Sequence, residues 1–255
     1  TLLERFQMMA FLNAGLRIRF RDERDTSSTE SEFQYDGGIK DFVRHLNDAK
    51  DPLFEEVGYL EAEEGGDEVE IAFQWNTGYQ LDGIHSFANG ISTIEGGMHE
   101  EGFKTALTST VNRYARAKNL LKEKEDNLQG DDIREGLTAI LSVRLQEPQF
   151  EGQTKAKLGN TSMRSLVQKA TNEALTDWLE EHPKEAKRTI GKAVDARRAR
   201  HAAQKAKNTD RKSALAGAGL PEKLTDCSSG DASETELYIV ESQSAGGSAK
   251  DARDP

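Results

Sequence analysis

The spacing of apolar residues along this chain predicts a mixture of strands and helices. Residues 69–75 alternate apolar and polar side chains, which predicts a strand with one buried face. Residues 137–145 are almost continuously apolar, as in a strand that is buried on both faces. Apolar residues at helical spacing predict helices over residues 39–46, 103–114 and 162–181. Together these patterns predict an α+β fold.

A further helix and a further strand are predicted in the last third of the chain. The helix covers residues 184–212 and is separate from the one before it, because Pro183 disfavours helical geometry in His182. Residues 236–240 (Glu-Leu-Tyr-Ile-Val) predict a strand that leads into Glu241 and a turn rich in glycine and serine. Because α/β folds place catalytic and metal-binding groups at the C-terminal ends of strands, Glu241 is a candidate for both roles.

The composition limits the classes of protein to which the chain can belong. Its 255 residues carry a net charge of −11, and 35% of them are hydrophobic and 31% charged. No run of about 18 apolar residues is present, so we expect no membrane span. The chain starts at Thr1 with neither a signal peptide nor an initiator methionine, and we expect it to be part of a longer protein. Cys227 is the only cysteine, so we expect no intrachain disulfide and a cytoplasmic location.

A polar loop over residues 150–160 connects the second predicted strand to the helix that follows it. Gln153, Lys155 and Lys157 lie near its tip, with a glycine on either side of the group. Ammonium and amide N–H groups stabilise charge on phosphoryl oxygens, so the loop predicts a contact with a nucleotide phosphate. The alternative, that both lysines are solvated loop residues, stays open on the loop chemistry alone.

The predicted helix 184–212 concentrates positive charge in an otherwise acidic chain. Eleven basic residues and three acidic ones give this segment a net charge of +8. A basic helix of this length is suited to following a phosphate backbone. A solubilising or strut-like helix explains the same charge equally well, and both interpretations stay open.

Two other polar clusters have simpler structural explanations. His99 follows a glycine pair, but neither a nucleophile nor a second metal ligand accompanies it in the sequence, so we expect a structural role at the start of a helix. Asp131 and Asp132 are expected to cap a helical turn rather than to bind a metal ion.

An ordered series of motifs identifies the family that this chain resembles. The motifs are residues 9–13 (Met-Ala-Phe-Leu-Asn), 35–38 (Tyr-Asp-Gly-Gly), 95–99 (Glu-Gly-Gly-Met-His), 130–137 (Gly-Asp-Asp-Ile-Arg-Glu-Gly-Leu), 153–155 (Gln-Thr-Lys), 211–215 (Arg-Lys-Ser-Ala-Leu), 220–227 (Leu-Pro-Glu-Lys-Leu-Thr-Asp-Cys) and 236–241 (Glu-Leu-Tyr-Ile-Val-Glu). In this order they resemble the B-subunit family of DNA gyrase, a type IIA topoisomerase, almost from end to end.

The resemblance implies three parts in the chain. Residues 1–36 match the C-terminal tail of a GHKL ATPase domain. Residues 37–212 match a transducer domain, which has a fold like the second domain of ribosomal protein S5 and long C-terminal helices. Residues 213–255 match a linker and the truncated start of an α/β Toprim domain. The family's nucleotide-binding residues would precede Thr1, so the chain by itself is expected to be inactive.

The resemblance also implies roles for individual residues. Gln153 and Lys155 match residues that contact the γ-phosphate of ATP. Glu241 matches the Toprim glutamate, which is catalytic and binds Mg²⁺ together with an Asp-x-Asp pair expected beyond Pro255. The basic helix would face the cavity through which a DNA duplex passes, so four of its residues are expected to be DNA-proximal: Arg197, Arg198, Arg200 and Lys205.

The implied function is that of the B subunit of an ATP-dependent topoisomerase that negatively supercoils DNA and couples ATP hydrolysis to strand passage. The implied cofactors are ATP and Mg²⁺. The implied partners are double-stranded DNA, the A subunit of gyrase in an A2B2 heterotetramer, and a second B subunit. The alternatives are the B subunit of topoisomerase IV, a non-enzymatic nucleic-acid-binding module that uses helix 184–212, and a mismatch-repair or chaperone relative from the same ATPase superfamily.

The sequence departs from the family pattern immediately after Glu241. The usual continuation begins with glycine and aspartate, and this chain has Ser242 and Gln243 instead. A serine would be less favourable than glycine by about 1 kcal/mol if this turn requires a positive φ. Gln243 also removes a negative charge beside the expected metal site.

Overall fold

The computed structural model describes residues 2–24, 29–122, 124–217, 229, 231 and 233–252, with the backbone alone for 29, 208–217, 243 and 244. Cys227 therefore lies outside the described residues. The chain divides into two compact units, Thr1–Ala199 and Arg200–Pro255, and each is described by itself.

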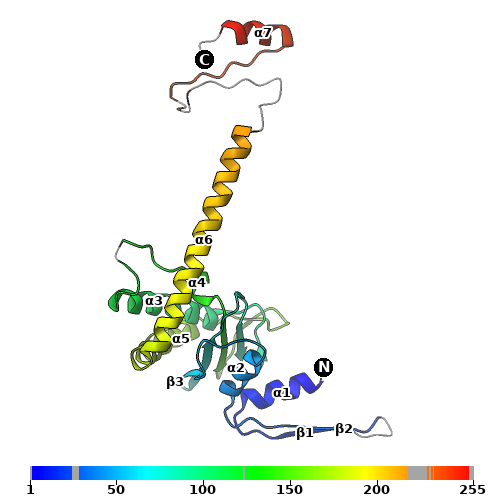
Figure 1. Cartoon of the computed structure of the whole chain (residues 1–255). Helices are drawn as coiled ribbons and strands as arrows, with labels where there is room; N and C mark the ends of the chain where they lie inside the picture. Colours follow the sequence, from blue (N-terminus) through cyan, green and yellow to red (C-terminus); the bar gives the residue numbers. More distant parts are fainter. Residues whose placement is uncertain are drawn as a thin grey trace. The chain divides into compact units, whose positions relative to one another are not determined.

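A five-stranded mixed sheet is the centre of the first unit (Figure 1). Its strands, in the order in which they pair, are β3 (Gly58–Glu64), β4 (Asp67–Trp75), β7 (Leu137–Arg144), β5 (Ile84–Ala88) and β6 (Ile91–Ser92). β4 and β7 confirm two of the predicted strands. β5 and β7 are parallel neighbours, and α3 (Met98–Ala117) and α4 (Gly130–Arg134) lie in the connection between them. The other three pairs are antiparallel, so the predicted α+β class is confirmed.

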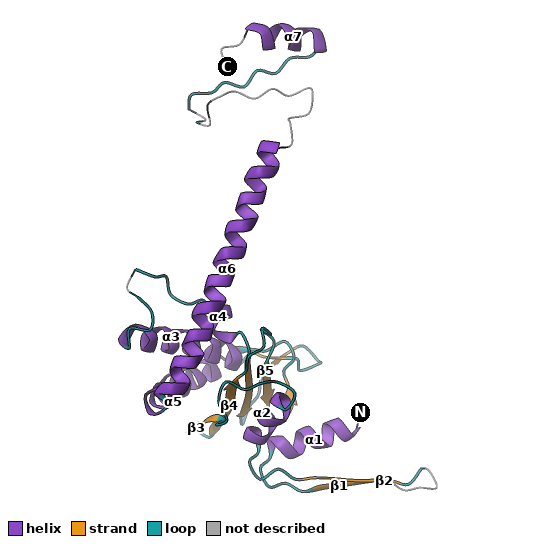
Figure 2. Cartoon of the chain, viewed as in Figure 1, coloured by secondary structure: helices purple, strands orange, loops and turns teal. Residues whose placement is uncertain are grey.

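The two faces of the sheet pack against different helices (Figure 2). Ile71 and Leu141 lie in the core beneath α3 and α5 (Thr161–Glu181), whereas Ala72 and Ile140 contact the cluster formed by α1 (Leu2–Leu12) and α2 (Ile39–Asn47). This alternation follows from the two-residue repeat of a strand. Both faces of β7 are covered, which explains its apolar sequence, and burial of each leucine or isoleucine contributes about 1.5–3 kcal/mol to stability. The helices α2, α3 and α5 confirm those predicted from helical spacing.

Two short hairpins extend from this core. β1 (Ile18–Asp22) pairs with β2 (Thr29–Phe33), and β8 (Phe150–Glu151) pairs with β9 (Lys157–Leu158), both in antiparallel fashion. The second hairpin encloses the tip of the predicted phosphate-contacting loop. Since β8 follows β7 in the chain, this loop is connected directly to the most buried strand of the sheet.

The predicted basic helix is confirmed as α6 (Pro183–Gly217), which belongs to the first unit up to Ala199 and to the second from Arg200 onward. The second unit also contains α7 (Gln243–Ala252). The strand predicted over residues 236–240 is wrong for the described structure, because this segment pairs with no described strand. Leu237, Tyr238 and Ile239 are 86%, 77% and 87% exposed. An apolar run needs a pairing partner to become part of a sheet, and the described part of the chain provides none here.

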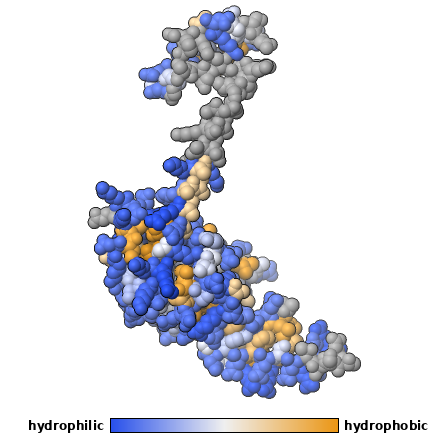
Figure 3. Space-filling model, viewed as in Figure 1, coloured by the Kyte–Doolittle hydropathy of each residue, from blue (hydrophilic) through white to orange (hydrophobic). Residues whose placement is uncertain are grey.

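One face of the molecule is predominantly polar (Figure 3). Hydrophilic side chains cover most of the face shown in Figure 3, in agreement with the high content of charged residues. None of the helices in the described part of the chain combines the length and the apolar character that crossing a membrane requires.

Candidate functional site

The loop between β8 and β9 presents Gln153 and Lys155 to solvent. The chain reverses in a turn over residues 152–155, with the Lys155 N–H 3.4 Å from the Gly152 carbonyl oxygen. Gln153, Thr154 and Lys155 are all exposed. Both residues that the sequence predicts for phosphate contact are therefore accessible at the tip of this loop.

Lys155 has an unfavourable backbone conformation. Its φ is +56°, and only two other non-glycine residues in the described part of the chain, Asn89 and Asn119, have a positive φ. Asparagine tolerates this left-handed region, whereas for lysine it costs about 1–2 kcal/mol. Strain of this kind persists where the surrounding structure imposes it, and it is concentrated at functional sites.

The two lysines of the loop differ in their surroundings. Lys157 forms an ion pair of 3.0 Å with Glu151 across the hairpin, and the hydrogen bond to that carboxylate raises the pKa of Lys157. The Lys155 ammonium forms no ion pair with any described residue, and its Nζ lies 5.8 Å from the centre of the Phe150 ring. Lys155 is thus the lysine whose charge remains available to a ligand.

One end of the loop is fixed by residues that flank the hairpin. The Gly159 N–H donates to the Gln149 carbonyl at 2.7 Å. The Asn160 side chain accepts a hydrogen bond from the Gln149 N–H at 2.6 Å and donates to the Glu147 carbonyl at 3.0 Å. Asn160 also stands at the N-cap of α5, so the end of the loop and the start of the helix share one residue.

The other attachment of the loop is to the turn that precedes α3. The Glu95 N–H donates to the Ala156 carbonyl at 2.9 Å, and the Leu158 N–H donates to the Gly96 carbonyl at 3.1 Å. A Cβ atom on Gly97 would lie 2.4 Å from the Leu158 carbonyl oxygen, and the φ of Gly97 is +141°. Only glycine allows this close approach. The strand that follows Lys155, β9, therefore packs directly against the glycine pair at 96–97. We call this glycine pair the seat of the loop.

The structural role predicted for His99 and the capping role predicted for Asp132 are confirmed, whereas Asp131 lies in the first turn of α4 and pairs with Arg134 at 2.6 Å. His99 is 0% exposed, its Nε2 lies 3.2 Å from the Thr93 hydroxyl, and burial lowers its pKa to about 4. It therefore does not face solvent as a catalytic base would. The Gln129 N–H donates to the Asp132 carboxylate at 2.8 Å in a capping box at the start of α4. Among the described residues, no cluster of three or more His, Cys, Asp or Glu side chains is placed to bind a metal ion.

Arg197 differs from the other basic residues predicted to lie near DNA. It is only 6% exposed, and its guanidinium donates to the Asp126 carbonyl at 2.7 Å and to the Glu125 carboxylate at 2.8 Å. These bonds connect α6 to the segment before α4. The charge of Arg197 is therefore paired inside the protein rather than available to DNA. The sequence contains a signal that was missed: Arg197 continues the helical spacing of the buried residues Ala186, Ile190 and Ala193.

The other three candidates on α6 are more accessible. Arg198 is exposed and forms an ion pair of 3.2 Å with Asp195 one turn earlier. Arg200 is half-buried, and Lys205 is exposed. These three residues remain candidates for contact with a phosphate backbone.

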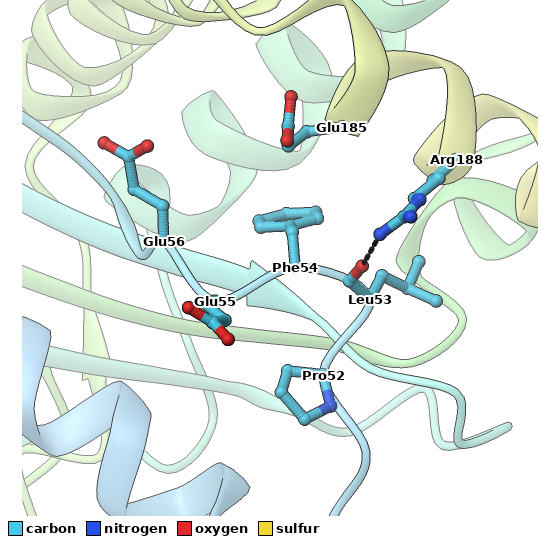
Figure 4. A pocket seen from close by; sticks show the side chains of 7 residues that line it. All are labelled: Pro52, Leu53, Phe54, Glu55, Glu56, Glu185 and Arg188. Atoms are coloured by element: carbon cyan, nitrogen blue, oxygen red, sulfur yellow. Dashed lines mark hydrogen bonds between the residues drawn. The ribbon is translucent and has the colours of Figure 1, made fainter.

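A hollow of about 480 Å³ lies beside the start of α6 (Figure 4). Phe54 extends into it, and the Arg188 guanidinium donates to the Leu53 carbonyl at 2.9 Å. Lys192 makes a similar bond one turn later, to the Gly78 carbonyl at 2.7 Å. None of the predicted site residues lines this hollow. Its residues are Pro52, Leu53, Phe54, Glu55, Glu56, Glu185 and Arg188.

Glu241 is exposed just before α7, and no second carboxylate or histidine forms a metal cluster with it among the described residues. A single carboxylate is insufficient for a Mg²⁺ site, so the described part of the chain does not by itself fit this ion. Ser242 caps α7, because its hydroxyl accepts a hydrogen bond from the Ala245 N–H at 3.2 Å. It is also absent from the described non-glycine residues with positive φ, so the expected strain does not arise.

Three comparisons with known proteins agree on the relatives of this chain. The DNA gyrase B family model matches residues 38–209. The DNA gyrase B subunit of Streptomyces coelicolor is 53% identical over 275 aligned residues, which cover 100% of this chain and 40% of the relative. The corresponding subunit of Mycobacterium tuberculosis is 49% identical over 285 aligned residues, with 100% and 42% coverage. The chain thus spans about two fifths of the length of the curated relatives that it matches.

Comparison with solved structures also indicates gyrase B and its relatives. The 43K ATPase domain of Thermus thermophilus gyrase B, in complex with an aminocoumarin, superposes with a TM-score of 0.73 at 38% identity, covering 82% of this chain and 55% of that one. The topoisomerase IV ATP-binding domain of Francisella tularensis gives 0.63 at 26% identity, with 78% and 53% coverage. Both are described as ATP-binding regions. The likeness to the ATPase region of gyrase B covers 82% of this chain, which corrects the expectation of a transducer and Toprim fragment in which only residues 1–36 belong to that region.

Proposed function

The chain belongs to the DNA gyrase B family, and from this premise we propose that it is part of an ATP-hydrolysing topoisomerase that negatively supercoils DNA. Its role in that enzyme is to couple ATP binding and hydrolysis to DNA strand passage. The match to the DNA gyrase B family model over residues 38–209, together with gyrase B relatives at 53% and 49% identity, favours gyrase over topoisomerase IV.

One observation carries the proposal. Lys155 is an exposed cation without an ion pair among the described residues, and it is held in a strained backbone conformation on a loop with two fixed attachments. A fixed cation stabilises charge that develops on a phosphoryl group without paying for reorganisation at the moment of reaction. In this proposal Lys155 and the Gln153 amide contact the γ-phosphate of ATP.

The contact would make the loop a sensor of hydrolysis. When the γ-phosphate leaves, the loop loses its strongest electrostatic partner, so the balance between two arrangements of the enzyme shifts. Because the loop follows β7 and precedes α5, a displacement at its tip is passed to the sheet and to a long helix. Arg198, Arg200 and Lys205 on α6 are the proposed contacts to DNA phosphates.

The remaining assignments complete the proposal. Within the ATPase region, residues 1–36 are the tail of the nucleotide-binding part and residues 37–212 are a transducer unit of the ribosomal S5 type. Residues 213–255 are a linker and the start of a Toprim domain, in which Glu241 would supply one carboxylate ligand of a Mg²⁺ site completed by other parts of the enzyme. The proposed partners are double-stranded DNA, the gyrase A protein in an A2B2 assembly and a second copy of the gyrase B protein, in the cytoplasm.

The test is a pair of lysine substitutions in the full-length gyrase B protein, assembled with the gyrase A protein. Lys155→Ala is expected to lower the rate of ATP hydrolysis by about 10²–10³-fold, as for the loss of one preorganised donor, and to abolish supercoiling. Relaxation of DNA without nucleotide should persist. Lys157→Ala removes the neighbouring lysine that is already paired with Glu151, and should leave all three activities unchanged. Unchanged ATP hydrolysis in Lys155→Ala would contradict the proposal.

A further inference from the structure

A chain of buried hydrogen bonds lies directly behind the turn on which the loop is seated. The Ser86 hydroxyl is 2.9 Å from the Glu100 carboxylate, the Thr93 hydroxyl is 2.7 Å from that of Ser86, and the His99 Nε2 is 3.2 Å from that of Thr93. Ser86, Thr93 and His99 are 4%, 2% and 0% exposed. Polar groups buried to this extent are costly unless every bond among them is made.

The bonds of this chain have only one consistent direction. The Ser86 hydroxyl has two partners that can only accept, the Glu100 carboxylate at 2.9 Å and the Thr93 carbonyl at 3.3 Å, so Ser86 is the donor to both. The Thr93 hydroxyl then donates to Ser86, and the His99 Nε2–H donates to Thr93. This order fixes the proton of the neutral imidazole on Nε2. The His99 Nδ1 makes no hydrogen bond in the described structure, so the ring is held through Nε2 alone.

The same residues fix the backbone that seats the loop. The Thr93 N–H donates to the Ser86 carbonyl at 2.9 Å, and the Gly96 N–H donates to the Thr93 carbonyl at 2.8 Å. The following residues, Glu95 and Gly96, hold the chain on either side of position 157 through the two bonds described above. Lys155 is the residue immediately before the first of these attachments. Three of these backbone hydrogen bonds thus connect the segment that begins at Thr93 to the residues that follow Lys155.

We propose that His99, Thr93, Ser86 and Glu100 are positioning residues that set the place of the Lys155 ammonium relative to its phosphate. This inference rests on the proposed function of Lys155 and adds the group of residues through which the protein controls it. Ser86, Thr93 and His99 are buried, so we assign them no direct contact with the nucleotide. Because the effect of a positioned charge depends steeply on its place, a shift of about 1 Å at the tip is expected to reduce the rate by up to about 10²-fold.

The test is a double-mutant cycle in the full-length gyrase B protein, assembled with the gyrase A protein. Thr93→Val removes the central hydroxyl with little change in volume, and kcat and KM for ATP hydrolysis are measured with it, with Lys155→Ala and with both. Thr93→Val is expected to lower kcat/KM by about 10–100-fold in the native background and to have no further effect in the Lys155→Ala background. Thr171→Val is the matched control, since Thr171 is 0% exposed and its hydroxyl makes no hydrogen bond in the described structure.

The outcomes separate this inference from the function on which it rests. An equal loss in both backgrounds, or no loss from Thr93→Val, would overturn the positioning role while leaving the role of Lys155 intact. No loss from Lys155→Ala would overturn the proposed function itself. If Thr93→Val lowers the Tm of the protein, the double-mutant cycle with Lys155→Ala is repeated with Ser86→Ala. This substitution removes the neighbouring hydroxyl of the same hydrogen-bond chain. Rescue adds a further check: His99→Gln, which keeps an N–H donor, should retain more activity than His99→Leu.

Discussion

The loop tip and the basic helix use positive charge in opposite ways. At the tip, Lys155 is exposed, is strained and has no ion pair among the described residues. Along α6, Arg188, Lys192 and Arg197 donate hydrogen bonds to the carbonyl oxygens of Leu53, Gly78 and Asp126, and of the three only Arg188 is exposed. Backbone carbonyls near loops are common partners of long cationic side chains, and such bonds contribute to holding the helix in place.

This difference shows that a count of charges does not identify a binding surface. The segment 184–212 carries a net charge of +8, yet three of its cations fix the helix to the body of the protein. The loop tip contributes a single lysine and is the stronger candidate for a ligand contact. The hydrogen bonds and ion pairs that each cation makes inside the fold decide between these roles, and these bonds are visible only in the structure.

The largest change in stability is expected for Gly97→Ala, which tests how firmly the loop that carries Lys155 is attached. The new Cβ would lie 2.4 Å from the Leu158 carbonyl oxygen at a φ of +141°, so the strand after Lys155 must leave its seat. We expect a loss of about 3 kcal/mol or more in the free energy of unfolding, measured with urea. Gly65→Ala is the control, because Gly65 has a φ of +64° but no atom near its Cβ position, and it should cost only about 1 kcal/mol. Equal losses of unfolding free energy for Gly97→Ala and Gly65→Ala would show that Leu158 does not pack closely against Gly97.

The next effect concerns the buried histidine behind the loop. Burial lowers the pKa of His99 to about 4, with Glu100 opposing the shift, whereas an unfolded histidine titrates near 6.5. The unfolded state therefore takes up a proton as the pH falls below about 6.5 while the folded state does not, so stability decreases from there down to about pH 4. We expect a loss of about 2 kcal/mol between pH 7 and pH 5 from this residue. In His99→Gln, urea unfolding at the two pH values should show a correspondingly smaller difference. An unchanged difference would mean that the pKa of His99 in the folded protein lies close to its value in the unfolded chain.

A smaller effect distinguishes the two neighbouring arginines of α6. Arg197→Met keeps the length of the side chain but removes its bonds to Glu125 and Asp126, and is expected to cost about 1.5 kcal/mol of stability. Arg198→Gln alters an exposed ion pair, so no measurable change in stability is expected. In the complete enzyme, Arg198→Gln should instead reduce the salt dependence of DNA binding by about one counterion. If Arg197→Met were the variant that alters the salt dependence, the assignment of internal and external charges would be reversed.

Local pattern predicted much of the fold. The alternation in β4, the apolar run in β7 and the helical spacing in α5 and α6 specify these elements because each is set by residues a few positions apart. The loop chemistry also selected Gln153 and Lys155 as exposed residues. The segment 236–240 shows the limit of this approach, because β-propensity alone does not produce a strand without a partner.

The site depends on contacts that local pattern does not contain. The seat of the loop joins Gly97 to Leu158, which are far apart in the sequence and adjacent in the folded chain. The ion pair of Arg197 with Glu125 likewise connects distant segments. Helical spacing is sufficient to place Arg197 on the buried face of α6. It does not show that a carboxylate and a carbonyl oxygen lie there to accept the hydrogen bonds of the guanidinium.

The central claim is that Lys155 recognises the γ-phosphate, and the most direct measurement compares two nucleotides. The affinities of the full-length gyrase B protein for a non-hydrolysable ATP analogue and for ADP are measured in the native protein and in Lys155→Ala. The account predicts that the variant binds the ATP analogue about 10–100-fold more weakly, the value of a charged hydrogen bond, and binds ADP with unchanged affinity. Equal affinities of variant and native protein for both nucleotides, or an equal loss for both, would contradict it.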